Sequence, residues 1–314
     1  MLTTDQLHAA RHAAAVGPLL APAFLRLSGK DARSYLHRMS TQDLERLAPG
    51  ESAYAAFLNA KGHLLGDGQV LARDADLLLA LEPAAMAAAR EHLERYVIMD
   101  DVAVEDGPAL RVLPVLGPEG PARLEGRAPG IPRVRNGRRG VPCVDLWLAP
   151  GEGEALRAAL VGDGLPALGE DELEALRIAG GAARFGADMD ASRLPMEAGL
   201  TRDAISFTKG CYIGQEVVLR ATARGHLQRG LVLLALPPGA GPGTPLVAGD
   251  AEVGAVTSAA DTPEGRLGLG YLRRAHWREG ERLSAAGGEA TVTRVVVEDG
   301  LPAERCQAAP RTSR

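Results

Sequence analysis

The sequence has few aromatic residues, few cysteines and no long apolar run. Aromatic residues make up only 4% of its 314 residues. Three cysteines, Cys143, Cys211 and Cys306, are an odd number at wide spacings, which argues against a disulfide framework and against a CxxC metal site. The longest apolar runs, such as 77–81 and 231–236, fall far short of the ~20 residues that a membrane helix needs. We therefore expect no membrane span, no metal ligands and no cluster held by this chain's thiols alone.

Positive charge is not in excess either. The net charge is −5, which gives no global attraction to nucleic acid or to an anionic membrane. The N-terminus lacks a basic region followed by an apolar block, so we expect no secretory signal and a cytoplasmic location. A chain of 314 residues exceeds the roughly 250–300 residues at which one core stops growing, so two or more packed units are expected.

Apolar periodicity and turn residues predict a mixed α+β protein. Expected helices cover 4–15, a segment after a Ser28 cap, 83–96, 152–161, 170–179 and 217–224. Expected strands cover 24–27, two or three segments within 52–81, 102–105 and 143–148. The stretch 117–142 is rich in glycine, proline and arginine and is expected to be an irregular connection. It lacks aromatic residues for base stacking, so a solvated loop is favoured over a nucleic-acid contact.

The C-terminal part changes to short strands separated by turns. Four strands are expected, at 231–236, 252–258, 266–271 and 290–297. This pattern predicts a small, closed or nearly closed β unit, in which the strand edges are protected. We therefore expect a mixed part over 1–229, a β-barrel over 230–307 and a frayed tail over 308–314.

One segment, 208–216, combines residue types that indicate reactive thiol chemistry. Gly210 and Gly214 bracket Cys211 and allow tight backbone geometry around it. A helix beginning near Gly214 and the charge of Lys209 would both favour a Cys211 thiolate, whereas Glu216 would oppose it. The alternative is a small buried cysteine in a tight turn, and the residues alone leave both open.

The run KGCYIGQE at 209–216 resembles the signature of the YgfZ-type proteins and their mitochondrial relatives, within the glycine-cleavage T-protein-like superfamily. Further blocks resemble the same superfamily from about residue 19 to 274, with 110–165 unsupported. These blocks are LSGKDA at 27–32 with TQD at 41–43, NAKG at 59–62, LRIAGG at 176–181 and LPMEAGL at 194–200.

The resemblance implies a T-protein-like cloverleaf of two interleaved α+β lobes that bind a reduced folate, followed by a small C-terminal β-barrel. Cys211 and Lys209 then become the candidate catalytic residues, and Glu197 the partner of the pterin ring, unless Glu197 is a surface carboxylate before a turn. The other implied contacts of tetrahydrofolate or a derivative are Tyr212, Gln215, Arg220, Arg224 and Arg229. The arginines fit a solvated helix face equally well.

Some residues depart from the pattern of the T-protein enzymes. Cys211-Tyr212 stands where those enzymes have aspartate-phenylalanine, and Gln215 where a basic residue is usual. Their paired aspartates are here Gly66-Asp67, and Leu81-Glu82 replaces an expected asparagine. Losing these polar groups weakens the case for aminomethyl transfer, which needs a positioned carboxylate. Asp67 could still serve in catalysis, or it could cap a turn.

The resemblance therefore implies an accessory protein for iron–sulfur cluster assembly or repair, which affects cluster-dependent enzymes such as those that modify tRNA. Its expected partners are a reduced folate and iron–sulfur proteins or assembly factors. One alternative is a tetrahydrofolate-dependent aminomethyltransferase. Another is an enzyme fold that docks RNA through the arginine-rich stretch 123–139, although direct nucleic-acid binding is not what we expect.

Overall fold

The computed structural model describes residues 1–224 and 227–299, without the side chains of 223 and 224. Contacts between residues divide the chain into two compact units that interleave along the sequence. Unit 1 comprises Met1–Pro22, Ala109–Ala183 and Leu231–Val295. Unit 2 comprises Ala23–Pro108, Arg184–Gly230 and Val296–Arg314, the last described as far as Asp299.

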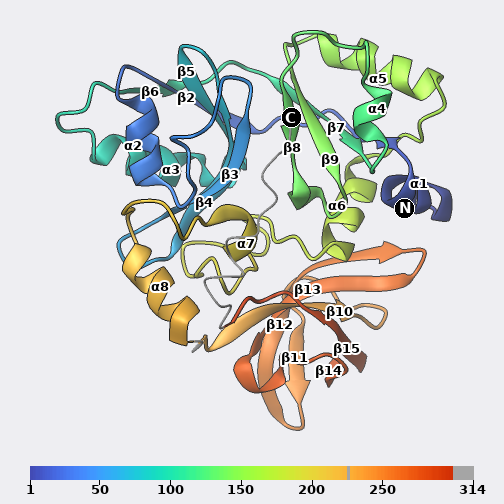
Figure 1. Cartoon of the computed structure of the whole chain (residues 1–314). Coiled ribbons are helices and arrows are strands. Elements are labelled where there is room, and N and C mark those ends of the chain that lie inside the picture. Colours follow the sequence, from blue (N-terminus) through green and yellow to red (C-terminus); the bar gives the residue numbers. More distant parts are fainter. Residues whose placement is uncertain (225–226, 300–314) are drawn as a thin grey trace. The chain divides into compact units, whose positions relative to one another are not determined.

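Unit 2 is built on an antiparallel five-stranded sheet with the order β3-β4-β5-β2-β6. The strands are β2 (Ala23–Ser28), β3 (Ser52–Leu58), β4 (Leu64–Ala72), β5 (Asp76–Leu81) and β6 (Ala103–Asp106). Helices α2 (Ala32–Met39) and α3 (Met86–Arg95), the latter preceded by η1 (Pro83–Ala85), pack on one face of the sheet (Figure 1).

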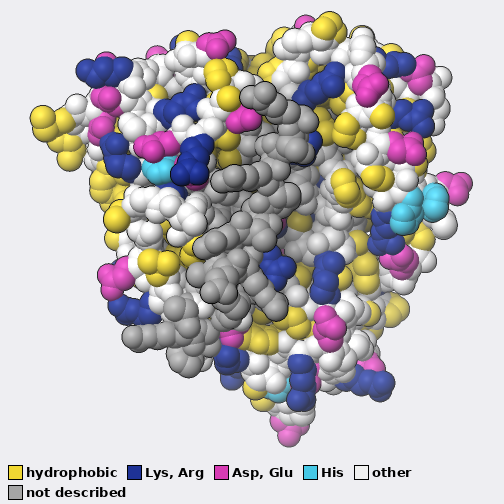
Figure 2. Space-filling model, viewed as in Figure 1, with side chains coloured by type: hydrophobic (Ala, Val, Ile, Leu, Met, Phe, Trp, Pro, Cys, Tyr) yellow, Lys and Arg dark blue, Asp and Glu magenta, His cyan; other side chains and the backbone are white. Residues whose placement is uncertain are grey.

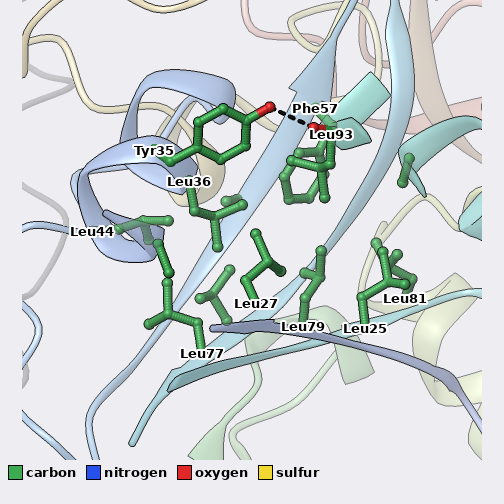
Figure 3. Packing of buried hydrophobic residues seen from close by; sticks show 14 of the residues in the cluster. Leu25, Leu27, Tyr35, Leu36, Leu44, Phe57, Leu77, Leu79, Leu81 and Leu93 are labelled. Atoms are coloured by element: carbon green, nitrogen blue, oxygen red, sulfur yellow. Dashed lines mark hydrogen bonds between the residues drawn. The ribbon is translucent and has the colours of Figure 1, made fainter. Parts of the chain in front are cut away.

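The core of unit 2 lies between those helices and the sheet. Leucines of β2 and β5 meet Tyr35 and Leu36 of α2 and Leu93 of α3 (Figure 3). The phenol of Tyr35 donates a hydrogen bond to the carbonyl of Leu93, so this buried hydroxyl is satisfied and also joins the two helices. Because alternate strand residues point to opposite faces, the other face of the sheet remains for polar side chains.

The expected Ser28 cap is wrong. Ser28 is the last residue of β2, and the residue before α2 is Asp31. Between them the chain turns at Gly29, whose φ of 110° and close approach to the Asp101 carbonyl exclude a side chain. The Asp31 carboxylate accepts a 2.8 Å hydrogen bond from the Asp101 N–H instead of capping the helix.

The rest of unit 2 holds two helices, α7 (Thr201–Ala204) and α8 (Gln215–Arg224). The chain returns to this unit after its last strand, because Glu298 accepts a 2.6 Å hydrogen bond from the N–H of Thr201. The Glu298 N–H in turn donates to the Met196 carbonyl at 3.1 Å. Residues 296–299 thereby fasten the segment that carries Glu197.

Unit 1 contains a four-stranded sheet, a closed six-stranded barrel and several helices (Figure 1). The sheet has the order β1 (Ala15–Val16), β7 (Arg111–Leu116), β9 (Cys143–Leu148), β8 (Arg133–Arg135). Its helices are α1 (Thr4–His12), α4 (Gly120–Arg123), η2 (Gly137–Arg139), α5 (Glu152–Gly162) and α6 (Glu170–Ala179). The barrel has the order β10 (Arg229–Ala235), β13 (Gly265–Arg273), β12 (Ala251–Thr262), β11 (Pro245–Ala248), β14 (Arg282–Ala285), β15 (Gly288–Val295), with η3 (Arg274–His276) after β13.

Arg177 joins α6 to the barrel inside unit 1. Its guanidinium donates to Ser258 of β12 at 2.9 Å, to the Ala182 carbonyl and to Glu174. Arg177 is only 6% exposed, and a buried guanidinium must find such partners to offset its desolvation. The LRIAGG block at 176–181, which contains Arg177 and resembles the superfamily, therefore has a structural role in this chain.

The expected α+β fold with a C-terminal β-barrel is confirmed. Strands β1, β7, β8, β11 and β14 were not expected, and the stretch 117–142 contains α4, β8 and η2 within its loops. The division at 229/230 stays a prediction, and the expected tail 308–314 and Cys306 lie outside the described residues. Across the described ranges, no helix combines the length and apolar character needed to cross a bilayer.

Candidate functional site

The segment 209–212 exposes a thiol between two buried side chains. Lys209 and Tyr212 are 9% and 8% exposed, whereas Gly210 and Cys211 are exposed. The alternative of a buried cysteine in a turn is therefore wrong. Because both neighbouring side chains point into the protein, the two residues between them form the tip of a short loop that presents the Cys211 thiol to solvent.

Lys209 is held by backbone oxygen atoms. Its Nζ donates to the carbonyls of His37, of Ser40 at 2.7 Å and of Gln42 at 3.0 Å, and lies 5.2 Å from the centre of the Tyr212 ring. Burial lowers the pKa of Lys209 to about 8, while Asp43 and Glu45 oppose that shift.

The two residues facing Lys209 also have displaced pKa values. Burial raises the pKa of the Tyr212 phenol, so this ring stays neutral. Burial and the charge of Lys209 lower the pKa of His37, whose Nδ1 accepts a 3.2 Å hydrogen bond from the N–H of Leu44. A neutral His37 fits that acceptor role.

A turn at 59–62 supports the other end of the loop. Gly214 has a φ of 84°, and a Cβ there would lie 2.8 Å from the Asn59 carbonyl oxygen. Helix α8 begins at the next residue, two positions before the expected helix 217–224. The neighbouring Gly62 leaves so little room that a Cβ would lie 2.9 Å from Val217 and 3.5 Å from Leu194. The NAKG block at 59–62, one of those that resemble the superfamily, therefore lies between the segment that carries Cys211 and the one that carries Glu197.

Glu197 is a buried carboxylate in contact with Arg229. Its side-chain oxygens both lie 3.4 Å from the Arg229 Nε, and one accepts a 3.2 Å hydrogen bond from the Leu194 N–H. Glu197 is 6% exposed, so the alternative of a surface carboxylate is wrong. Burial raises the pKa of Glu197, while the Arg229 charge and the Leu194 N–H oppose that shift.

Asp67 lies in the middle of β4, paired with Ala56 of β3, so the alternative of a turn cap is wrong. Tyr54 donates its phenol hydrogen to this carboxylate. Gln69 lies two residues further along β4, opposite Tyr54, and points to the same face as Asp67. Gln69 is 7% exposed, and its buried Oε1 atom has no hydrogen-bond partner among the residues that the structure describes. Tyr54 and Gln69 were not among the residues predicted for the site. The available signal was that Asp67 and Gln69 alternate along one strand of a hairpin and that Tyr54 lies on the other.

The remaining candidates lie on α8. Gln215 is partly exposed, and the exposed Arg220 pairs with Glu216 at 2.6 Å, an i,i+4 ion pair. The side chain of Arg224 lies outside the described residues. Within the described ranges, no hydrogen bond or ion pair joins Glu197 or Arg229 to Lys209, Cys211 or Tyr212.

The arginine-rich stretch of unit 1 uses most of its charge internally. Arg127 pairs with Asp163 at 2.6 Å, and Arg139 pairs with the buried Asp145 at 2.9 Å. Arg133 and Arg138 donate to backbone carbonyls. Figure 2 shows Lys and Arg side chains mixed with Asp and Glu over the described part of the face in view. These arginines are therefore poorly placed to act together on a phosphate backbone.

The described residues contain no group of three or more His, Cys, Asp and Glu side chains that could hold a metal ion. Of the two described cysteines, Cys143 is buried and Cys211 is exposed. Burial, aided by Asp145, raises the pKa of the Cys143 thiol, so this cysteine is an inert core residue.

Comparison with known protein families matches two separate parts of the chain. Residues 3–128 match the model of the GCVT N-terminal domain, and residues 228–298 match that of the CAF17 C-terminal beta-barrel domain. An aminomethyltransferase of Alcanivorax borkumensis is 26% identical over 73% of this chain and 69% of its own length. An aminomethyltransferase of a Synechococcus species is 30% identical over 68% of this chain and 65% of its own.

A solved structure has the same fold. The crystal structure of the glycine cleavage system aminomethyltransferase T from Bartonella henselae superposes with a TM-score of 0.79, at 23% identity, over 94% of this chain and 89% of that one. The fold and the two matched domains show that this chain is a member of the T-protein-like superfamily. The CAF17-type barrel that follows the GCVT domain places the chain in the YgfZ/CAF17 family.

Proposed function

We propose that this chain is a folate-binding accessory protein for the assembly or repair of iron–sulfur clusters in other proteins. The exposed Cys211 thiol, held between the buried side chains of Lys209 and Tyr212, is the observation that carries the proposal. A thiolate is both a nucleophile and a ligand for iron, and its reactivity requires access from solvent. The clients in this proposal are iron–sulfur proteins or assembly factors, including cluster-dependent enzymes that modify tRNA.

The buried polar groups of unit 2 fit a reduced folate. A pterin ring presents amino and ring N–H donors, and a carboxylate is a suitable acceptor for such a pair. Glu197 supplies a buried carboxylate that accepts a side-chain hydrogen bond from Arg229 at 3.4 Å. Gln69 supplies a buried amide oxygen that has no donor within the described part of the chain, and an unsatisfied buried acceptor costs about 1–3 kcal/mol. A ligand with several N–H groups would recover part of that cost.

In this proposal Glu197 holds the pterin, and Arg229 orients the Glu197 carboxylate. Tyr212, Gln215, Arg220 and Arg224 are the other residues that we propose for folate binding. A bound tetrahydrofolate, or a derivative of it, would supply a carrier for one-carbon groups. The chain's own residues would bind that carrier and present the thiol of Cys211.

The test of the function uses cells that lack this protein. We expect the wild-type chain to restore the activity of a cluster-dependent enzyme, measured in extracts at matched protein levels, and folinic acid to bind the purified chain. Failure of the wild-type chain to raise that activity, although it is folded and binds folinic acid, would contradict the accessory role.

The second candidate function is that of a tetrahydrofolate-dependent aminomethyltransferase. It is favoured by the curated relatives, which are aminomethyltransferases, and by the buried Asp67 with its Tyr54 partner on β4. Incubation with tetrahydrofolate and an aminomethylated lipoyl carrier distinguishes the two. Ammonia release with formation of methylenetetrahydrofolate, abolished in Asp67→Asn, would establish the enzyme, and our proposal predicts neither product.

A further inference from the structure

The C-terminal end of α2 has backbone carbonyls that the helix itself does not satisfy. The last four carbonyls of any α-helix lack intrahelical donors and must find other partners. In unit 2 two side chains from distant parts of the sequence lie at this end. Lys209 donates to the carbonyls of His37, Ser40 and Gln42, and His92 Nε2 lies 3.4 Å from the carbonyl of Met39.

From this arrangement we propose that Lys209 is a positioning residue for Cys211. Its ammonium group and the three carbonyls form what we call the Lys209 tether, which fastens the thiol-bearing loop to the end of α2 across 169 residues of sequence. The proposal refines the site described above, and it rests on the proposed function only for its readout in cells.

The number of donors decides how Lys209 acts. An ammonium group has three N–H donors, and three carbonyl oxygens accept from it here. No donor remains for a direct hydrogen bond to the Cys211 sulfur. Lys209 therefore influences the thiol through the position of the backbone two residues away.

Three fixed points surround the thiol. The Lys209 tether lies on one side, the buried ring of Tyr212 on the other, and Gly214 fits against the Asn59 carbonyl beyond it. Gly210 has open space around it, with no heavy atom within 4 Å of a Cβ placed there. Without these three fixed points, the exposed residues Gly210 and Cys211 would thus move freely. A thiol that must meet a cluster or a partner sulfur gains from being held in one orientation.

The experiment compares Lys209→Met with the matched control Lys61→Met, which alters an exposed lysine in the neighbouring turn. Amide hydrogen exchange should become at least tenfold faster over 206–214 in Lys209→Met and stay unchanged in Lys61→Met. Cys211 should still react with iodoacetamide, because this small reagent needs only access to the thiolate of an exposed cysteine. Rescue of cluster-dependent enzyme activity should nevertheless fall at least tenfold.

Chemical rescue separates the tether from a general packing role. In Lys209→Ala, propylammonium can replace the missing ammonium arm, whereas tetramethylammonium has no N–H to donate. We expect propylammonium alone to restore slow exchange over 206–214. Unchanged exchange in Lys209→Met, or equal recovery with both cations, would overturn the proposal.

If Lys209→Met does not fold, Lys209→Arg keeps a cationic donor, and fast exchange over 206–214 in that folded variant would count equally against the tether. If Cys211→Ser supports full rescue while Lys209→Met still loosens the loop, the role proposed for Cys211 fails and the tether stands; if the wild-type chain gives no rescue, the proposed function fails and the exchange measurements still decide the tether.

Discussion

Both carboxylate oxygens of Glu197 lie 3.4 Å from Nε of Arg229, although the two residues are 32 positions apart in the sequence. The same guanidinium donates to the Ser192 carbonyl at 2.5 Å. Arg229 and the segment that carries Glu197 both belong to unit 2. Glu197 is thereby a buried acceptor that Arg229 holds in place in unit 2.

Replacing Glu197 by Gln should weaken the binding of folinic acid. A hydrogen bond to a charged group contributes about 1.5–3 kcal/mol, so the dissociation constant should rise by about 10- to 100-fold. Because burial raises the pKa of Glu197 above its ordinary value, wild-type affinity should fall as the pH decreases through that raised pKa. Affinity of the variant should not follow this profile. Titration calorimetry between pH 5 and pH 8 measures both effects, with the exposed Glu216→Gln as the control, and equal affinities would rule out the assigned role.

The two described cysteines should differ strongly in reactivity. In a Cys306→Ser background, iodoacetamide should modify Cys211 in the native protein and Cys143 only after unfolding. Cys143 is 7% exposed and its pKa is raised by burial, so it offers little thiolate. Mass spectrometry of peptides from a time course gives both rates. Modification of Cys143 at the rate of Cys211 would contradict the core position of β9.

Gly214→Ala should destabilise the chain, whereas Gly210→Ala should not. At Gly214 an alanine would need a left-handed backbone, which costs about 1–2 kcal/mol, and its Cβ would press on the Asn59 carbonyl. We expect the free energy of unfolding to fall by about 2 kcal/mol or more, against about 0.5 kcal/mol or less for Gly210→Ala. Urea denaturation of both variants makes the comparison. Equal losses would show that the 59–62 turn does not confine Gly214.

Lys209 should make stability depend on alkaline pH. Its pKa is about 8 in the folded chain, against 10.5 for the ordinary side chain. Between these values the unfolded chain binds a proton that the folded chain has released, so the folded state gains stability as the pH rises. The Lys209→Met variant lacks this gain. The unfolding free energy of wild type minus that of the variant should therefore increase from pH 8 to pH 10 in urea titrations, and a constant difference would contradict the lowered pKa.

Periodicity and motif spacing predicted much of this fold. Helix α6 and strand β9 cover the same residues that the apolar pattern indicated, because each has a continuous buried face. Strands β11 and β14 were missed because each has only four residues, too few to show a clear alternation. A small C-terminal β-barrel was nevertheless expected, from its longer strands and the turns between them.

The candidate site was only partly predictable. The KGCYIGQE run located Cys211, and the PMEAGL block located Glu197. The partners of Lys209 are main-chain carbonyls of residues 37, 40 and 42, and a carbonyl carries no sequence signal. The buried Oε1 of Gln69, which finds no donor among the described residues, likewise follows from strand pairing and burial, which only the folded chain reveals.

The role of Cys211 is tested most directly in cells that lack this protein, by the activity of a cluster-dependent enzyme after supply of Cys211→Ser or Cys143→Ser at equal levels. We predict that Cys143→Ser restores wild-type activity and that Cys211→Ser, although folded and able to bind folinic acid, restores less than a tenth of it. Full restoration by Cys211→Ser would show that the exposed thiol is not the working group of this protein.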